Sequence, residues 1–190
     1  MIAYQKEKID NAICFFALRH KEETGKNLSQ TFLYKYLALF EFEYLKKYGH
    51  PPLGLKYLAM ERGPVPIGIY EKRATYSTSC AVFKKIEEDR FLVIAKGKPD
   101  MDYFSSAEIE EMSRLIKIYA DQFVRASDIS DASHEEIRAW RRIFYDKKPN
   151  APIDYALEFE GDLNEKPSEK LSPAEESYLI FKALEEAANK

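Results

Sequence analysis

The chain has 190 residues and a mass of 22.1 kDa, with 29 basic residues (Lys and Arg) and 32 acidic ones (Asp and Glu), so its formal net charge is −3. A composition of 45% hydrophobic and 14% aromatic residues excludes intrinsic disorder and predicts one folded domain with a sizeable core. No apolar run approaches the roughly 18 residues of a membrane span, and the charged residues at 6–10 argue against a signal peptide.

The first two helices are predicted from apolar residues that recur at spacings of three and four. One covers residues 4–20. The next follows Ser29, a good N-cap, runs to residue 47 and ends before Gly49, a typical residue just after a helix.

The central part of the chain is predicted to hold the β-structure. Residues 55–60 form a short strand candidate, followed by a stiff corner at Gly63-Pro64-Val65-Pro66 and a helix from there to about residue 76. Residues 81–86 and 91–95, joined by a polar turn, predict a hairpin.

Three capping-box patterns begin at Ser105, Ser133 and Ser172, and each predicts a helix start. The first helix is expected to continue to Phe123, and the second carries Trp140 on its apolar face. Residues 147–170 are expected to be mostly loop, with a short ordered piece at 153–159. The last helix either packs back on the domain or docks on a partner. The predicted fold class is mainly α with a small antiparallel β-sheet (α+β), a compact helical domain with a β-hairpin or three-stranded sheet inserted.

Motifs for metal, cofactor or nucleotide binding are absent. The three histidines, His20, His50 and His134, are far apart, and no GxSxG or phosphate-loop pattern occurs. We therefore expect no metal, no cofactor and no enzymatic activity. For His134 a structural role is favoured, either a local hydrogen bond or a ring that braces Trp140.

The two cysteines, Cys14 and Cys80, are too few for a disulfide framework. We expect Cys14 to be a buried thiol and Cys80 to lie in a loop where it is accessible. A reducing cytoplasm is therefore the expected location.

Two surface clusters leave alternatives open. The acidic balance argues against nucleic acid as a partner, and a basic cluster around Trp140 is interpreted as a solvated helix face rather than a nucleic-acid patch. This cluster consists of Arg138, Arg141, Arg142, Lys147 and Lys148. Four tyrosines could form an aromatic protein interface, namely Tyr34, Tyr48, Tyr57 and Tyr70.

Two segments together resemble the SocA-like antitoxin family, also called the Panacea domain. In residues 32–70 a helix rich in Leu and Tyr ends in Gly, and a short strand leads to Gly-Pro-Val. In residues 118–140 a helix is followed by Ser-His, with Trp six residues beyond the His. The resemblance covers roughly residues 10–159. The family-motif residues, read as structural or interface-shaping, are Gly63, Pro64, Val65, Pro66, Ser133, His134 and Trp140.

The resemblance implies a mostly helical domain with a small sheet, found in bacteria and phages and often encoded beside a toxin that it neutralises by binding. Residues 1–160 would form this domain, and residues 161–190 a linker and an amphipathic helix packed on it. The implied partner is a cognate protein toxin, with no membrane and no catalytic residues. The alternatives are a phage-associated protein of another role, an enzyme that uses His134 with Asp131 or Glu135 as acid and base, and a DNA-binding regulator.

Overall fold

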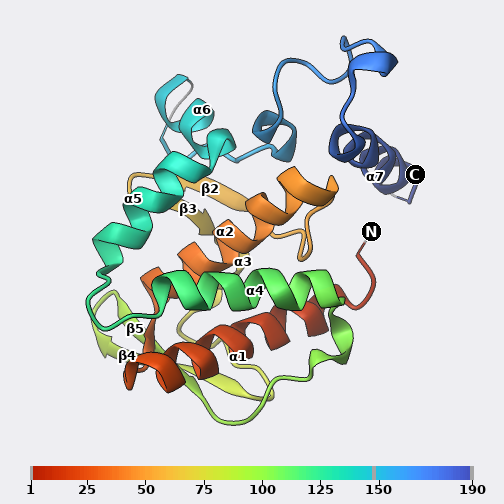
Figure 1. The fold of residues 1–190 in the computed structure, drawn as a ribbon. Helices are drawn as coiled ribbons and strands as arrows, with labels where there is room; N and C mark the ends of the chain where they lie inside the picture. Colours follow the sequence, from red (N-terminus) through yellow and green to blue (C-terminus); the bar gives the residue numbers. More distant parts are fainter. Residues whose placement is uncertain (1, 147–148, 189–190) are drawn as a thin grey trace.

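A computed structural model describes residues 2–146 and 149–188, and its central element is helix α2 (Gln30–Tyr48). Helices α1 (Gln5–Thr24) and α4 (Ser106–Tyr119) pack on it, and the remaining elements surround it (Figure 1). Ser29 caps α2 by accepting a hydrogen bond from the Phe32 amide, and Gly49 ends it with φ of 76°. Because α2 is buried on nearly all sides, it is apolar around most of its circumference.

The core between α1 and α2 is aromatic. Phe16 of α1 stacks on Tyr36 of α2 with ring centroids 4.9 Å apart, and His20 Nδ1 lies 3.2 Å from the Tyr36 hydroxyl. Burial lowers the pKa of His20 to about 4, so this imidazole is neutral near pH 7. The histidine is therefore a core residue with a hydrogen-bond partner.

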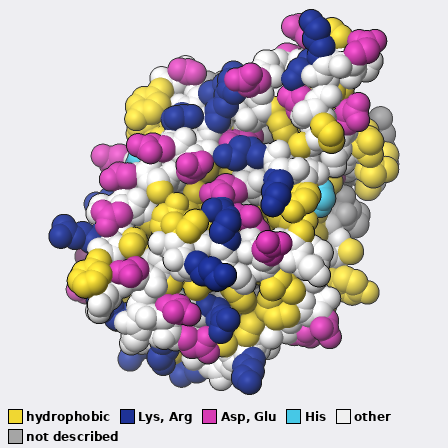
Figure 2. Space-filling view, in the orientation of Figure 1, with side chains coloured by type: hydrophobic (Ala, Val, Ile, Leu, Met, Phe, Trp, Pro, Cys, Tyr) yellow, Lys and Arg dark blue, Asp and Glu magenta, His cyan; other side chains and the backbone are white. Residues whose placement is uncertain are grey.

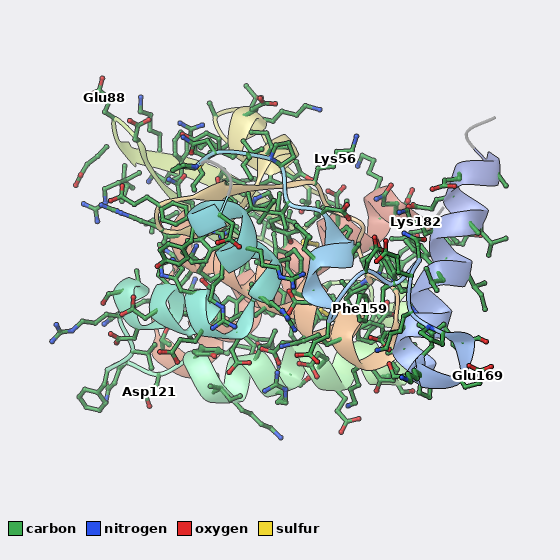
Figure 3. All side chains as sticks on the ribbon, turned by 90° about the horizontal axis from the view of Figure 1, so that it is seen from above. Lys56, Glu88, Asp121, Phe159, Glu169 and Lys182 are labelled. Carbon is green, nitrogen blue, oxygen red and sulfur yellow. A yellow bond between two sulfur atoms is a disulfide. The ribbon has the colours of Figure 1, made fainter. Side chains whose placement is uncertain are left out.

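The main sheet has three antiparallel strands in the order β1-β5-β4, which are β1 (Leu28–Ser29), β4 (Ala81–Glu87) and β5 (Arg90–Ala95). The predicted hairpin is confirmed, and the α+β fold class with it. Its tip carries Glu88, which extends away from the body in Figure 3. Strand β1 is two residues long, too short for periodicity to detect.

The predicted corner at Gly63–Pro66 is instead a strand, β3, which pairs antiparallel with β2 (Tyr57–Met60). Pro64 and Pro66 fit this strand because they lie opposite Ala59 and Tyr57. The backbone N–H and C=O groups of these two β2 residues point away from β3. The Ala59 amide donates to Ala151 O at 2.9 Å, and Tyr57 O accepts from the Ile153 amide at 2.9 Å. The missing proline N–H groups therefore cost no ladder hydrogen bond.

Several predicted helix limits are wrong. Helix α3 (Ile67–Lys72) is shorter than expected, and α4 stops at Tyr119, which leaves Phe123 80% exposed in a loop. The capping box at Ser105 is confirmed, but Ser133 does not open a helix.

Ser133 lies instead in the last turn of α5 (Ala126–Glu136), which is separated from α6 (Arg138–Asp146) by a break at Ile137. Helix α5 starts earlier because the Asp128 carboxylate accepts a hydrogen bond from the Arg125 amide at 2.7 Å. The Ser-His-Glu-Glu pattern at 133–136 therefore lies at the end of this helix and not at its start.

The C-terminal part confirms the third capping box, in which Ser172 and Glu175 bond each other's backbone amides at the start of α7 (Pro173–Ala188). Short 3₁₀ turns lie at Met101–Tyr103, Tyr155–Glu158 and Ser168–Lys170, the second within the predicted ordered piece. Helix α7 packs back against α2, and Tyr178 is buried against Phe159, which is labelled in Figure 3.

The two cysteines are joined in a disulfide, which corrects the expectation of free thiols. Cys14 of α1 and Cys80, just before β4, have Cα atoms 5.7 Å apart, and Cys80 is 4% exposed. The bond ties the first helix to the three-stranded sheet across 66 positions of sequence. Two cysteines are too few for a disulfide framework, but they suffice for a single cross-link. Among the described residues, no helix has the length and apolar character needed to cross a bilayer.

Candidate functional site

A cleft of about 660 Å³ opens beside α2, and we call it the Lys35 cleft after the cation in its wall. Its volume lies in the range of small-molecule sites. Its lining includes Gln30, Thr31, Tyr34, Lys35, Met60, Glu61, Arg62, Val65, Tyr70, Arg73, Asp89 and Phe144. A smaller cavity of about 360 Å³ shares Thr31, Glu61 and Arg62 with this cleft and is also lined by His134, so the β2–β3 turn separates two adjoining spaces.

Lys35 is 1% exposed, although burying a charged ammonium group costs much free energy. Burial lowers its pKa to about 7, so protonated and neutral forms coexist near neutral pH. No carboxylate among the described residues forms an ion pair with it. The sequence contains a signal for this residue, since Lys35 stands in a run of apolar and aromatic residues, with Phe32 and Leu39 one turn away on either side.

Gly63 gives the Lys35 side chain its space. A Cβ atom at this position would lie 2.4 Å from Lys35 Nζ and 2.8 Å from Ser133 Oγ, and the Gly63 φ is 99°. Any larger residue would meet both a steric clash and an unfavourable backbone conformation. The Gly-Pro-Val and Ser-His segments therefore meet at the Lys35 ammonium, although 70 positions separate Gly63 from Ser133.

Gly63→Ala is expected to destabilise the protein by about 2 kcal/mol, because the new methyl group must displace Lys35 or Ser133 at a positive φ. Gly68→Ala is the matched control, since a Cβ there meets no atom within 4 Å inside helix α3. Urea unfolding of both variants checks this. Equal stability of the two variants would show that Gly63 is not needed for space.

The rings of His134, Trp140 and Phe144 form a stack beside the cleft. The His134 ring lies parallel to Trp140, with centroids 4.0 Å apart, and Trp140 stacks on Phe144 at 4.8 Å. The Trp140 indole donates a hydrogen bond to Met60 O at 2.9 Å, which fixes the stack to the β2–β3 hairpin. The histidine therefore does brace Trp140, across the break between α5 and α6.

His134 and Ser133 differ in how their polar atoms are satisfied. The Ser133 hydroxyl donates to Ser130 O at 2.7 Å and is fully buried. His134 Nε2 is buried without a hydrogen-bond partner. Burial, and then the nearby Lys35, lowers the pKa of His134, so the ring is neutral near pH 7.

The remaining family-motif residues have two roles. Val65 lines the cleft, whereas Pro64 and Pro66 lie in β3, which pairs with β2.

The predicted surface clusters are only partly exposed. Tyr34 and Tyr57 are buried, so these two cannot contribute to an exposed aromatic interface, while Tyr48 and Tyr70 are half-buried. In the basic cluster Arg138 pairs with Glu160 at 3.1 Å and Arg141 is exposed. Lys147 and Lys148 lie outside the described residues.

A family model described as "Antitoxin SocA-like, Panacea domain" matches residues 33–141, more than half of the chain. The chain belongs to the SocA-like antitoxin family. No curated protein and no solved structure matches it significantly.

The matched part of this Panacea domain contains Lys35, Gly63, Ser133, His134 and Trp140. It ends before α7 and begins after α1. Nine residues of the Lys35 cleft lie within the family segment, and the other lining residues, Gln30, Thr31, Phe144, Pro149 and Asn150, lie outside it. Within residues 2–146 and 149–188, no three His, Cys, Asp or Glu side chains gather as metal ligands. The ionisable groups of the cleft are Lys35, Arg62, Arg73, Glu61, Asp89 and the hydroxyls of Tyr34 and Tyr70.

Proposed function

We propose that this protein is an antitoxin of a bacterial or phage toxin–antitoxin system and that it neutralises a cognate protein toxin by binding it directly. The supporting observation is the family match over residues 33–141. In this proposal the protein acts by binding and not by catalysis. Acidic and basic side chains are interspersed over the face in Figure 2, which favours a protein partner over nucleic acid.

Exposed apolar side chains supply candidates for the toxin interface. Ile180 and Leu184 are 61% and 63% exposed and lie one turn apart on α7, whereas Tyr178 of the same helix is buried. Helix α7 thus has one face on the domain and an apolar strip facing outward. Such a strip is typical of helix-mediated binding.

The test is to express the neighbouring reading frame from an inducible promoter, with and without this protein, and to follow growth and co-purification. Rescue of arrested growth together with a stable complex supports the proposal. The double variant Ile180→Glu/Leu184→Glu should weaken the complex at least about tenfold. Ala183→Glu, which adds one charge on the exposed part of the same helix, is the control. No toxicity and no complex would contradict the proposal.

A cytoplasmic location is part of the same proposal, and the Cys14–Cys80 disulfide is an observation against it, because cytosolic thiols are normally kept reduced. Counting free thiols in protein unfolded under alkylating conditions directly from cells decides between the two. Two free thiols would agree with the cytoplasm, and none would favour an oxidising compartment.

An enzyme that uses His134 is the rival proposal, and the unpartnered Nε2 of His134 is the observation in its favour. His134→Ala separates the two functions. If the variant still rescues growth, catalysis by His134 is not required for neutralisation. If it stays folded and loses rescue while the toxin complex persists, the catalytic proposal gains.

A further inference from the structure

The Lys35 cleft contains more cationic side chains than its own carboxylates neutralise. Lys35, Arg62 and Arg73 line it, against Glu61 and Asp89. Asp89 already pairs with Arg73, at 3.2 Å, and its side chain is 83% exposed. The Lys35 ammonium is thus left without a counter-ion in a place where water is largely excluded.

Polar atoms without partners lie in the same wall. The Tyr34 hydroxyl and Arg73 Nε are buried donors with no hydrogen-bond partner, and Gln30 Oε1 is a buried acceptor in the same condition. Buried polar groups in folded proteins are nearly always satisfied, so the two unpartnered donors in this wall indicate an acceptor that completes them. Gln30 Oε1 needs a donor, which an anion does not supply. Two donors in the same cleft as an ammonium fit an anion.

Part of the lining is apolar. Met60, Val65 and Phe144 face the cleft, and Phe144 is held by its stack on Trp140. Arg73 lies 4.1 Å from the Tyr70 ring centroid, which fixes the guanidinium over an aromatic face. An anion bound here would therefore also contact apolar surface, which an inorganic ion could not use.

We infer that the Lys35 cleft binds a small organic anion, whose carboxylate or phosphate group is held by Lys35, the Tyr34 hydroxyl and Arg73 and whose apolar body lies against Met60, Val65 and Phe144. The anion supplies the missing counter-ion of Lys35 and a partner for the orphaned donors. Benzoate binding is measured without a toxin, so the growth assay and the measurement below can fail separately.

The test uses the full chain with benzoate as the organic anion, benzamide as its neutral analogue and inorganic phosphate as the bare anion. Trp140 is the single tryptophan and stacks on Phe144 of the cleft, so its fluorescence reports occupancy, and calorimetry gives the affinity. We expect saturable benzoate binding that is at least about tenfold tighter than that of benzamide or phosphate.

Variants locate the site. Lys35→Met should weaken benzoate binding at least about tenfold, and Lys56→Met, at an exposed lysine labelled in Figure 3, should leave it unchanged. Tyr34→Phe removes only the hydroxyl and should weaken binding a few-fold, which tests the site even if Lys35→Met fails to fold. No saturable benzoate binding, equal affinity for benzamide or phosphate, or unchanged binding in folded Lys35→Met and Tyr34→Phe would each overturn the inference.

Discussion

Lys35→Met is expected to stabilise the folded protein by roughly 4 kcal/mol at about pH 6, an unusual direction for a core substitution. Methionine matches the length of the lysine stem and needs no counter-ion. It removes an ammonium that is buried beside Gly63 and Ser133 without an ion pair to any described carboxylate. The cost of burying that charge disappears with it.

The sign follows from proton binding by the two states. The pKa of Lys35 falls from 10.5 in the unfolded chain to about 7 in the folded one. Between these values the unfolded state holds the extra proton, so the wild-type free energy of unfolding rises with pH across this window. The variant lacks this rise, and its advantage over wild type shrinks toward pH 10.5.

The contribution of Lys35 to the pH dependence of stability must be separated from that of the other ionisable groups nearby. His134 faces it from α5, and Arg62, Glu61 and Arg73 line the same cleft. Urea unfolding of wild type, Lys35→Met and the exposed control Lys56→Met at about pH 6, 8 and 10 isolates the contribution of Lys35. A constant difference between wild type and Lys35→Met at all three values would contradict the prediction.

The order of elements follows closely from the sequence because it depends on local signals. The Ser29 cap, the Gly49 helix end, the 81–95 hairpin and the capping boxes at Ser105 and Ser172 act within a few residues of themselves. Ser133 shows the limit of such signals. Its pattern is that of a helix start, but the Asp128 cap upstream and the burial of Ser133 beside Lys35 place it at a helix end.

The candidate site depends on contacts that no local signal encodes. The motif residues Gly63, Ser133, His134 and Trp140 could be named from the family resemblance, but not the residue around which they gather. Lys35 comes from another helix and is noticed only as a charge within an apolar run. The Cys14–Cys80 pairing likewise depends on how α1 packs against the sheet, which spacing alone does not specify.

Glu41→Gln is expected to stabilise the protein by roughly 3 kcal/mol at about pH 8 and to change little at about pH 4.5. Glu41 is fully buried in α2, and burial raises its pKa to about 7, opposed by hydrogen bonds with Tyr155 and the Leu55 backbone. Glutamine keeps the shape and the acceptor oxygen but never ionises.

The hydrogen bonds around Glu41 agree with a protonated carboxyl. The Tyr155 hydroxyl lies 2.7 Å from Glu41 Oε1 and 2.5 Å from Leu55 O. It has one proton and can donate to one of the two oxygens. If that oxygen is Leu55 O, the proton in the other contact must come from Glu41. The same geometry with an ionised Glu41 leaves Leu55 O without its donor.

The pH window for Glu41 lies below that for Lys35. Between 4.5 and about 7 the folded state keeps the carboxyl proton that the unfolded state has lost, so wild-type stability falls as pH rises. Urea unfolding of Glu41→Gln across this window should show a difference from wild type that grows with pH. Glu110→Gln, at an exposed position, controls for loss of a negative charge. A difference that stays flat would show that Glu41 ionises normally.

The two groups together predict a minimum of stability near pH 7. Below this pH the ionisation of Glu41 lowers the free energy of unfolding as pH rises, and above it the loss of the Lys35 proton raises that free energy. Lys35 lies beside Gly63 and Ser133, whereas Glu41 lies beside Leu55 and Tyr155, so these neighbours are not shared. Sites without shared partners give nearly additive effects. The double variant Lys35→Met/Glu41→Gln should therefore lose both arms of the pH profile. A profile that keeps its minimum in the double variant would assign it to other groups, of which His20 and His134 are the next to test.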